Sequence, residues 1–203
     1  MNNVLLIGKR GGVGQACLPI LLNKGYQVTA MTSEDLDLNF PERVFELDLS
    51  KVDILINCAG HSRGTYQGFF KNSWQNQLSQ INVNFVSNIF LLKHFANSCS
   101  RGKYVWISSA AIRNSRSSHS TYVSSKIASK SAIDMVRIEC PHIDITEINT
   151  GVIKNNFRYV NYDGSKTHKE VEESYVGNSY VESEYVAQNL VKAMEANLKE
   201  IVI

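Results

Sequence analysis

Short apolar runs alternate with longer amphipathic stretches from one end of the sequence to the other. The runs are rich in Val, Ile and Leu at consecutive positions, which is typical of parallel strands buried on both faces. The stretches between them carry apolar residues three and four positions apart and predict helices. This alternation predicts an α/β fold, a doubly wound parallel sheet with helices on both faces. The predicted strands span residues 3–8, 27–32, 53–58, 103–108, 144–149 and 200–203.

The helix limits follow from capping residues as well as from periodicity. Residues 13–24 carry an apolar stripe that closes at Gly25, a residue common just past a helix end. Pro41 stands near the start of a shorter helix, where its missing N–H is tolerated. The predicted helices span residues 13–24, 40–51, 73–98, 120–139 and 182–198. Residues 154–183 fit no period and predict an irregular insert.

The composition is that of a globular chain, with 43% apolar and 20% charged residues, and the length predicts one domain over residues 1–203. With 21 Lys and Arg against 19 Asp and Glu, no strong field favours nucleic acid or an anionic membrane as a partner. The apolar stretch Val4–Ile7 is too short for a signal peptide or a membrane span, so we expect a cytoplasmic protein. Four cysteines without a Cys-x-x-Cys pair favour reduced thiols over disulfides or a metal site.

A glycine-rich loop, Gly8 to Gly14, lies between the first predicted strand and the first predicted helix. A helix N-terminus after a tight turn offers free N–H groups and the positive end of a dipole to a phosphate. Glycines allow such a ligand to approach the backbone closely. The loop lacks the Gly-Lys-Ser/Thr of ATPases and predicts a nucleotide site, with a plain flexible turn as the alternative.

Tyr122 and Lys126 are four residues apart in a predicted helix and therefore lie on one face of it. A phenol with an ordinary pKa of about 10 is a poor acid or base at neutral pH, and a neighbouring ammonium lowers that pKa by favouring the phenolate. The pair is thus a candidate proton-transfer device. The alternative is a surface pair without function.

Four blocks of the sequence, in this order, resemble the motifs of the short-chain dehydrogenase/reductase (SDR) family. They are the glycine loop, the Asn57–Gly60 turn, Ser109 and the Tyr122–Lys126 segment, with the serine thirteen residues before the tyrosine. The resemblance implies a Rossmann-like fold that binds NAD(P). It also implies an oxidoreductase that interconverts a carbonyl and an alcohol by hydride transfer, so the expected substrate is a small carbonyl or alcohol compound.

The resemblance assigns roles to the catalytic residues. Tyr122 exchanges a proton with the substrate oxygen, while Lys126 holds the nicotinamide ribose and lowers the pKa of the tyrosine. Ser109 hydrogen-bonds the substrate oxygen, and Ser108 is the alternative at that strand end.

A helical asparagine of the family binds a water that relays protons to the lysine. Asn82 resembles this residue because of its apolar flanks, and Asn84 is the rival position. The resemblance also assigns cofactor contacts to the glycine loop, to the segment before the predicted helix 40–51, and to the ends of the third and fifth strands. These residues are Gly8, Gly12, Val13, Gly14, Asp37, Leu38, Asn57, Ala59, Gly60, Gly151 and Val152, with Tyr122 and Lys126.

The choice between NAD and NADP is expected at the end of the second strand. Rossmann folds that bind NAD place an acidic residue there, against the ribose hydroxyls, whereas this sequence has Thr32 and Ser33. Lys9 and Arg10 resemble the basic residues that hold the 2′-phosphate in NADP-dependent members. We therefore expect NADP(H) as the preferred cofactor, with NAD(H) as the alternative because two acidic residues follow directly.

Two segments depart from the family's usual length. Only four residues separate Ser33 from Leu38, which leaves no room for the usual helix and strand, so we expect about six strands in place of seven. This shortened region resembles that of dehydrorhamnose reductases. The insert at 154–183 is interpreted either as a mobile substrate lid or as an irregular surface segment packed by its tyrosines, and the sequence does not decide between the two. Family members pair two long helices between subunits, here 73–98 and 120–139, which predicts a homodimer or homotetramer.

Two other functions stay open. A catalytically silent, NAD(P)-sensing regulator would keep the fold, but such relatives usually lose the tyrosine or the lysine, and both stand here. A sugar-nucleotide-modifying SDR enzyme would share Tyr122 and Lys126 but needs a substrate domain. Only 77 residues follow Lys126, from the length of 203.

Overall fold

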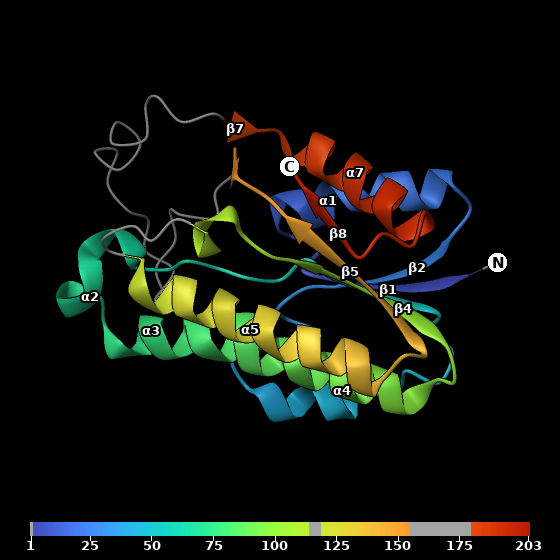
Figure 1. Ribbon diagram of the computed structural model, residues 1–203, viewed down its shortest axis with the longest axis horizontal. Helices are drawn as coiled ribbons and strands as arrows, with labels where there is room; N and C mark the ends of the chain where they lie inside the picture. The colour runs from blue at the N-terminus through green and yellow to red at the C-terminus, as the bar shows by residue number, and fades with distance from the viewer. Residues whose placement is uncertain (1, 114–118, 155–179) are drawn as a thin grey trace.

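Six parallel strands form the central sheet of the computed structural model (Figure 1), which describes residues 2–113, 119–154 and 180–203. The strands are β1 (Asn3–Ile7), β2 (Gln27–Met31), β3 (Ile54–Asn57), β4 (Gly102–Ile107), β5 (Ile143–Asn149) and β8 (Glu200–Val202). Their order is β2-β1-β3-β4-β5-β8, which confirms the doubly wound α/β fold and the expected six strands. The strand order reverses between β1 and β3, and in such sheets ligands bind at the carboxyl ends of the strands on either side of that point.

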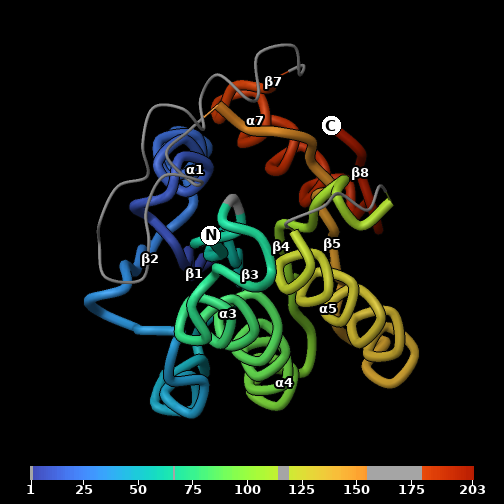
Figure 2. Tube along the Cα trace, turned by 90° about the vertical axis from the view of Figure 1, so that its left-hand side faces the viewer, coloured from blue at the N-terminus to red at the C-terminus, as the bar shows by residue number. Residues whose placement is uncertain are grey.

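Helices cover both faces of the sheet (Figures 1 and 2). One face carries α1 (Gly12–Asn23) and α7 (Ser183–Glu195), and the other carries α3 (Trp74–Ile81), α4 (Ser87–Ser98) and α5 (Ser120–Glu139).

Alternate residues of each strand divide between two cores, because successive side chains point to opposite faces. In β1, Val4 and Leu6 pack in the core beneath α1 and α7, whereas Leu5 and Ile7 pack in the core beneath α4 and α5. One row of neighbouring residues on the α5 face crosses the sheet from strand to strand, as Ile7, Asn57, Trp106, Glu147 and Glu200. This row is apolar at β1 and charged at β5 and β8.

Helices α3 and α4 follow one continuous path over the predicted range 73–98. Ser73 caps its start, since its side-chain oxygen accepts a hydrogen bond from the backbone N–H of Asn76 at 3.2 Å. Between the two helices, Asn82–Val86 form a π-helical segment. Such a local widening occurs frequently at functional sites.

Two predictions of secondary structure were wrong. Residues 40–51 form only a 3₁₀-helix, Pro41–Glu46, because Leu47 leaves the helical conformation and Asp48 accepts the backbone N–H of Ser50 in a turn. Within the predicted irregular insert and just before it, β6 (Val152–Ile153) and β7 (Tyr180–Val181) pair as a two-stranded sheet. The predicted lid otherwise falls on residues 155–179, outside the described residues.

Three exclusions concern the described ranges as a whole. No helix there is both long and apolar enough to cross a bilayer. No group of three His, Cys, Asp or Glu side chains gathers in them that could hold a metal ion. All four cysteines are free thiols, as the sequence predicts.

Candidate active site

The glycine loop brings the end of β1 close to the start of α1 and to the end of β3. Gly8 has φ +86°, and a Cβ on it would lie 2.7 Å from the backbone nitrogen of Ala59. A Cβ on Gly14 would overlap the carbonyl oxygen of Gly8, so neither position accepts a side chain without a shift of the backbone. Helix α1 therefore begins directly above the strand ends, and its first N–H groups have no side-chain cap. Such an end favours a phosphate.

A cavity of about 200 Å³ opens at this helix end and runs along the carboxyl ends of β3, β4 and β5. It joins the regions that the sequence assigned to the cofactor and to catalysis. The sequence-predicted residues that line it are Gly12, Val13, Ala59, Gly60, Ser109, Tyr122, Lys126, Gly151 and Val152.

Tyr122 and Lys126 lie one turn apart on α5, where both are buried. The ammonium of Lys126 donates a hydrogen bond to the carbonyl oxygen of Ile107 at 2.9 Å. Burial lowers the pKa of Lys126 to about 8, and the charge of Glu147 opposes that shift. The ammonium is thus still charged at neutral pH but titrates close to it, beside the phenol. This arrangement suits proton transfer.

Two serines follow the end of β4 and border the same cavity. Ser109 caps the 3₁₀-helix η4 (Ala110–Ile112), and its Oγ accepts the backbone N–H of Ala111 at 3.2 Å. The next residue, Ala110, donates its N–H to the carbonyl oxygen of Thr150 at 2.9 Å. That bond holds the serine segment against the end of β5. The structure brings Ser108 and Ser109 equally to the cavity wall, so both stay candidates.

Asn57 steadies the turn that forms the opposite wall. Its Oδ1 accepts the backbone N–H of Ala59 at 3.0 Å, and its Nδ2 donates to Asn88 Oδ1 of α4 at 2.9 Å. The amide oxygen and nitrogen of Asn57 therefore both have partners within the protein, and the residue lies outside the cavity lining. Its contribution to a cofactor site is the position of Ala59 and Gly60.

The structure brings Asn84, and not the favoured Asn82, between α5 and the turn after β3. Asn82 lies apart from the cavity and donates to the carbonyl oxygen of Asn39 at 2.9 Å. Asn84 lies in the π-helical segment, exchanges hydrogen bonds with the backbone of His61, and donates to Ser125 on α5 at 3.2 Å. The helical period alone cannot show this difference, because the π-turn changes which side chains face α5.

At the rim of the loop, Arg10 forms two hydrogen bonds with Glu34, at 2.6 and 2.9 Å. Both side chains are mostly exposed, with 60% and 71% of their surface in contact with solvent. The hydrogen bonds and charge of Arg10 lower the pKa of Glu34, which therefore stays ionised. Thr32 donates its backbone N–H and its hydroxyl to Asp35. Arg10, which is expected to hold a 2′-phosphate, is therefore paired with the carboxylate of Glu34 in this structure.

The remaining predicted contacts lie away from the cavity lining. Asp37 accepts the backbone N–H of Asn39 at 2.9 Å in a local turn, and Leu38 is buried in the core beneath α4. Lys9 and Ser33 are exposed at the rim. Leu38 thus lies in the core and outside the cavity lining, and its contact with the cofactor stays a prediction.

Sequence reasoning missed several residues of the lining, among them His119, Ser62 and Cys58. His119 stands three positions before Tyr122, so helical spacing along α5 would have identified it. Ser62 and Cys58 flank the Ala59–Gly60 turn, and nothing in their own pattern distinguishes them.

Comparisons with known proteins identify similar chains. A sequence model described as short chain dehydrogenase matches residues 39–163. No curated protein matches. Among solved structures, the protein lin1944 from Listeria innocua has a TM-score of 0.79 at 15% identity, with 100% of both chains covered.

Two further structures are complexes with a nicotinamide cofactor. A short chain dehydrogenase from Burkholderia cenocepacia J2315 in complex with NADP has a TM-score of 0.80 at 17% identity, covering 99% of this chain and 87% of its own. A 4-hydroxyisoleucine dehydrogenase complexed with NADH has a TM-score of 0.81 at 21% identity, covering 100% of this chain and 96% of its own. At these identities the likeness shows the fold.

Proposed function

The chain belongs to the short-chain dehydrogenase family, and on that premise we propose that it is an NAD(P)-dependent oxidoreductase interconverting a carbonyl and an alcohol. One observation carries the proposal. Tyr122, Lys126 and the two strand-end serines line the same cavity as the uncapped start of α1. A phosphate site and a proton-transfer pair in one cavity are what hydride transfer from a bound dinucleotide requires.

In the reducing direction, the Tyr122 hydroxyl donates its proton to the carbonyl oxygen while the carbonyl carbon receives the hydride. The charged Lys126 stabilises the phenolate that remains, and Ser109 or Ser108 donates a hydrogen bond to the same substrate oxygen. The bound nicotinamide supplies or accepts the hydride. In the oxidising direction the phenolate takes the proton from the alcohol.

The residues present fit a nicotinamide dinucleotide. Gly12 and Val13 line the cavity at the first turn of α1, where helix N–H groups favour a pyrophosphate. Lys9 and Arg10 favour NADP(H), and the NADP in the Burkholderia structure supports that choice. Glu34 opposes it, and the NADH in the 4-hydroxyisoleucine dehydrogenase structure supports NAD(H) as the alternative.

A homodimer or homotetramer is proposed through α3 and α5. Large apolar side chains on these helices are exposed in the single chain, Trp74 to 68% and Ile138 to 74% of their surface. Leu78 of α3 and Ile127 and Met135 of α5 are also about half exposed. Apolar side chains clustered on the outside of a monomer favour association. Light scattering of wild type and Ile138→Glu tests this, and a stable wild-type monomer contradicts it.

The test of activity is a screen of carbonyl compounds and alcohols, followed through the absorbance of the reduced cofactor. The Tyr122→Phe variant is the blank, because it keeps the ring and loses the proton. We expect at least one compound to be turned over by wild type and not by the blank. Tight cofactor binding with no turnover of any compound would indicate a sensor in place of an enzyme.

A further inference from the structure

A block of four buried polar residues lies on the sheet beneath α5. Trp106 of β4 and Ser108, just after that strand, lie beside Glu147 and Asn149 of β5. Trp106 and Glu147 are in register, and the backbone N–H of Ser108 donates to the carbonyl oxygen of Ile148. All four are at most 2% exposed. Each has one polar side-chain atom with no hydrogen-bond partner among the described residues, namely Trp106 Nε1, Ser108 Oγ, Glu147 Oε1 and Asn149 Oδ1.

Four such atoms in adjacent positions point to a bound molecule. Buried polar groups in folded proteins nearly always have a partner, either protein or ordered water. Here Trp106 offers only a donor, Glu147 and Asn149 offer acceptors, and the Ser108 hydroxyl offers both. A molecule that donates and accepts at short range satisfies this set, and water does so where 2–4 polar groups converge.

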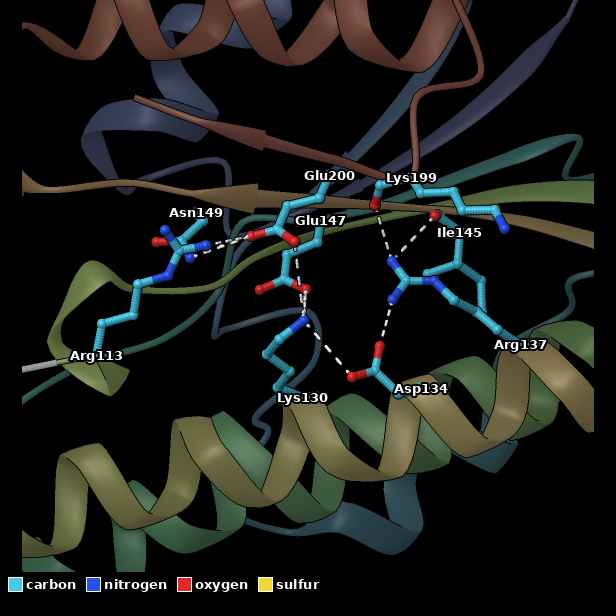
Figure 3. A network of polar contacts seen from close by, with 9 residues as sticks. All are labelled: Arg113, Lys130, Asp134, Arg137, Ile145, Glu147, Asn149, Lys199 and Glu200. Carbon is cyan, nitrogen blue, oxygen red and sulfur yellow. Dashed lines mark hydrogen bonds and ion pairs between the residues drawn. The ribbon is translucent and has the colours of Figure 1, made fainter.

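The carboxylate of Glu147 is fully buried, and of its two oxygens only Oε2 has a hydrogen-bond partner among the described residues. Its Oε2 accepts a hydrogen bond from Lys130 of α5 at 2.8 Å (Figure 3). Lys130 also lies 3.5 Å from Asp134 and 4.0 Å from Glu200, so its charge is shared among three carboxylates. Arg113 in turn binds Glu200 at 3.0 Å. The second oxygen of Glu147 is therefore the unsatisfied end of a charged network.

Lys126 stands one turn before Lys130 on the same helix, above the same block. Its Nζ is bound to Ile107, the residue between Trp106 and Ser108, and lies 6.0 Å from the centre of the Trp106 ring. Trp106 is the strand neighbour of Glu147. Lys126 and Glu147 are thus both neighbours of Trp106.

We propose that this block holds buried water between Glu147 and Lys126, and that Glu147 is a positioning residue whose negative charge keeps the Lys126 ammonium protonated. The proposal deepens the proposed function, on which it rests only for the role of Lys126 beside Tyr122. Glu147 touches neither substrate nor cofactor and acts through Lys126. The pKa of Lys126, lowered by burial and raised by Glu147, agrees in direction.

Other charged groups around Lys126 do not replace Glu147. From the segment after β3, His61 has its pKa lowered to about 3 by burial and by the charges of Arg63 and Lys126, so it is neutral near pH 7. Arg63 and Lys130 are cations and oppose protonation of Lys126. From β8 and α5, Glu200 and Asp134 are partly exposed and paired with Arg113, Lys130 and Arg137.

The first test measures the titration of Lys126 itself, on the folded protein without substrate. The ¹³Cε resonance of Lys126, assigned by loss in Lys126→Met, is followed by NMR from neutral to alkaline pH in wild type, Glu147→Gln, Glu147→Asp and Glu200→Gln. We expect the pKa to fall by about one unit in Glu147→Gln, to recover in Glu147→Asp, and to stay unchanged in Glu200→Gln. An unchanged pKa in Glu147→Gln overturns the proposal.

A second measurement needs no variant, in case Glu147→Gln does not fold. A high-resolution crystal structure of wild type is expected to contain water within about 3.2 Å of both Glu147 Oε1 and Trp106 Nε1. A dry block, or a rearrangement that pairs these atoms directly, overturns the bound water. Neither measurement uses turnover, so an inactive wild type would overturn the proposed function and leave both results interpretable.

Discussion

Two ion pairs of similar length stand at opposite ends of the candidate site and differ in their surroundings. Arg10 and Glu34 meet at 2.6 Å on the rim of the glycine loop, with both side chains mostly in solvent. Lys130 and Glu147 meet at 2.8 Å beneath α5, where Glu147 has no exposed surface. An exposed pair contributes little because water screens it, whereas a buried carboxylate that loses its partner is strongly unfavourable. The same contact distance therefore has different consequences.

The comparison extends to the two halves of the cavity. The half built by β4, β5 and α5 holds Tyr122 and Lys126 buried, with Lys126 fixed by a backbone carbonyl. The half at the glycine loop borders a rim near the end of β2, where Arg10 and Glu34 lie on an open surface. We infer that the reaction type depends on the buried residues Tyr122 and Lys126. Cofactor preference depends on the exposed rim of Arg10 and Glu34, where substitutions are better tolerated.

The largest effect is expected in the buried half. Tyr122→Phe should lower turnover on the order of 10²- to 10⁴-fold, because it removes the proton donor. Cofactor affinity should change little. Tyr104→Phe is the matched control, since Tyr104 is also buried and its hydroxyl bonds Asn88, away from the cavity. Steady-state kinetics and cofactor titrations check both, and a fully active Tyr122→Phe sharply contradicts the division.

Acid should lower the stability of the fold through His61, a buried side chain in the segment after β3. The unfolded chain takes up a proton on this side chain near pH 6.5, whereas the folded protein does so only near pH 3. Stability should therefore fall as the pH drops through this window, by about 1.4 kcal/mol per pH unit for this group. Denaturant unfolding at several pH values measures the slope.

His61→Gln should flatten that slope between pH 6 and 4, while His142→Gln, at the opposite end of the sheet, should leave it unchanged. Equal slopes in wild type and His61→Gln would show that other groups cause the acid sensitivity.

Asn57→Ala should cost about 1–3 kcal/mol of unfolding free energy, because it leaves the Ala59 N–H without its partner and removes one of the two donors to Asn88 Oδ1. Cofactor binding should weaken as well, since the turn that carries Ala59 and Gly60 loosens. Asn189→Ala, in an exposed position on α7, is the control and should stay close to wild type. If Asn57→Ala were as stable as wild type, the Ala59–Gly60 turn would not depend on the Asn57 side chain.

The smallest effects belong to the rim. Arg10→Ala should weaken NADPH binding about two- to fivefold and leave NADH binding unchanged, because only the 2′-phosphate needs the guanidinium. Glu34→Gln should strengthen NADPH binding by a similar factor, since it frees Arg10. Glu195→Gln, which removes the charge that pairs with Lys24 at a partly exposed site far from the loop, is the control. Fluorescence titrations decide, and preference for NADH in wild type would reverse the cofactor assignment.

The same comparison explains what the sequence could predict. The strands and the long helices were predictable because the period of the apolar residues reflects their burial. Tyr122 and Lys126 lie on one of these helices, α5. The shortened front end was predictable once the spacing from Ser33 to Leu38 was compared with that of the SDR family. The place of Asn84 was not, because a π-turn in an otherwise regular helix leaves no periodic signal. Nor was the Arg10–Glu34 pair, which depends on how the chain turns after β2.

Glu147 was also beyond prediction. It lies in a strand that also carries Asp144 and Thr146, so its own position does not mark it, and its partner Lys130 is seventeen positions away on a helix. Only the register of β4 with β5 brings the carboxylate beside Trp106 and beneath α5.

The most direct test of the account is a crystal structure with NADPH bound. It should place the pyrophosphate against the backbone of Gly12 and Val13, and the nicotinamide ribose within hydrogen-bond distance of Lys126 Nζ, with the reactive ring facing Tyr122. A cofactor bound elsewhere, or bound in this cavity with its nicotinamide turned away from Tyr122 and Lys126, would contradict it.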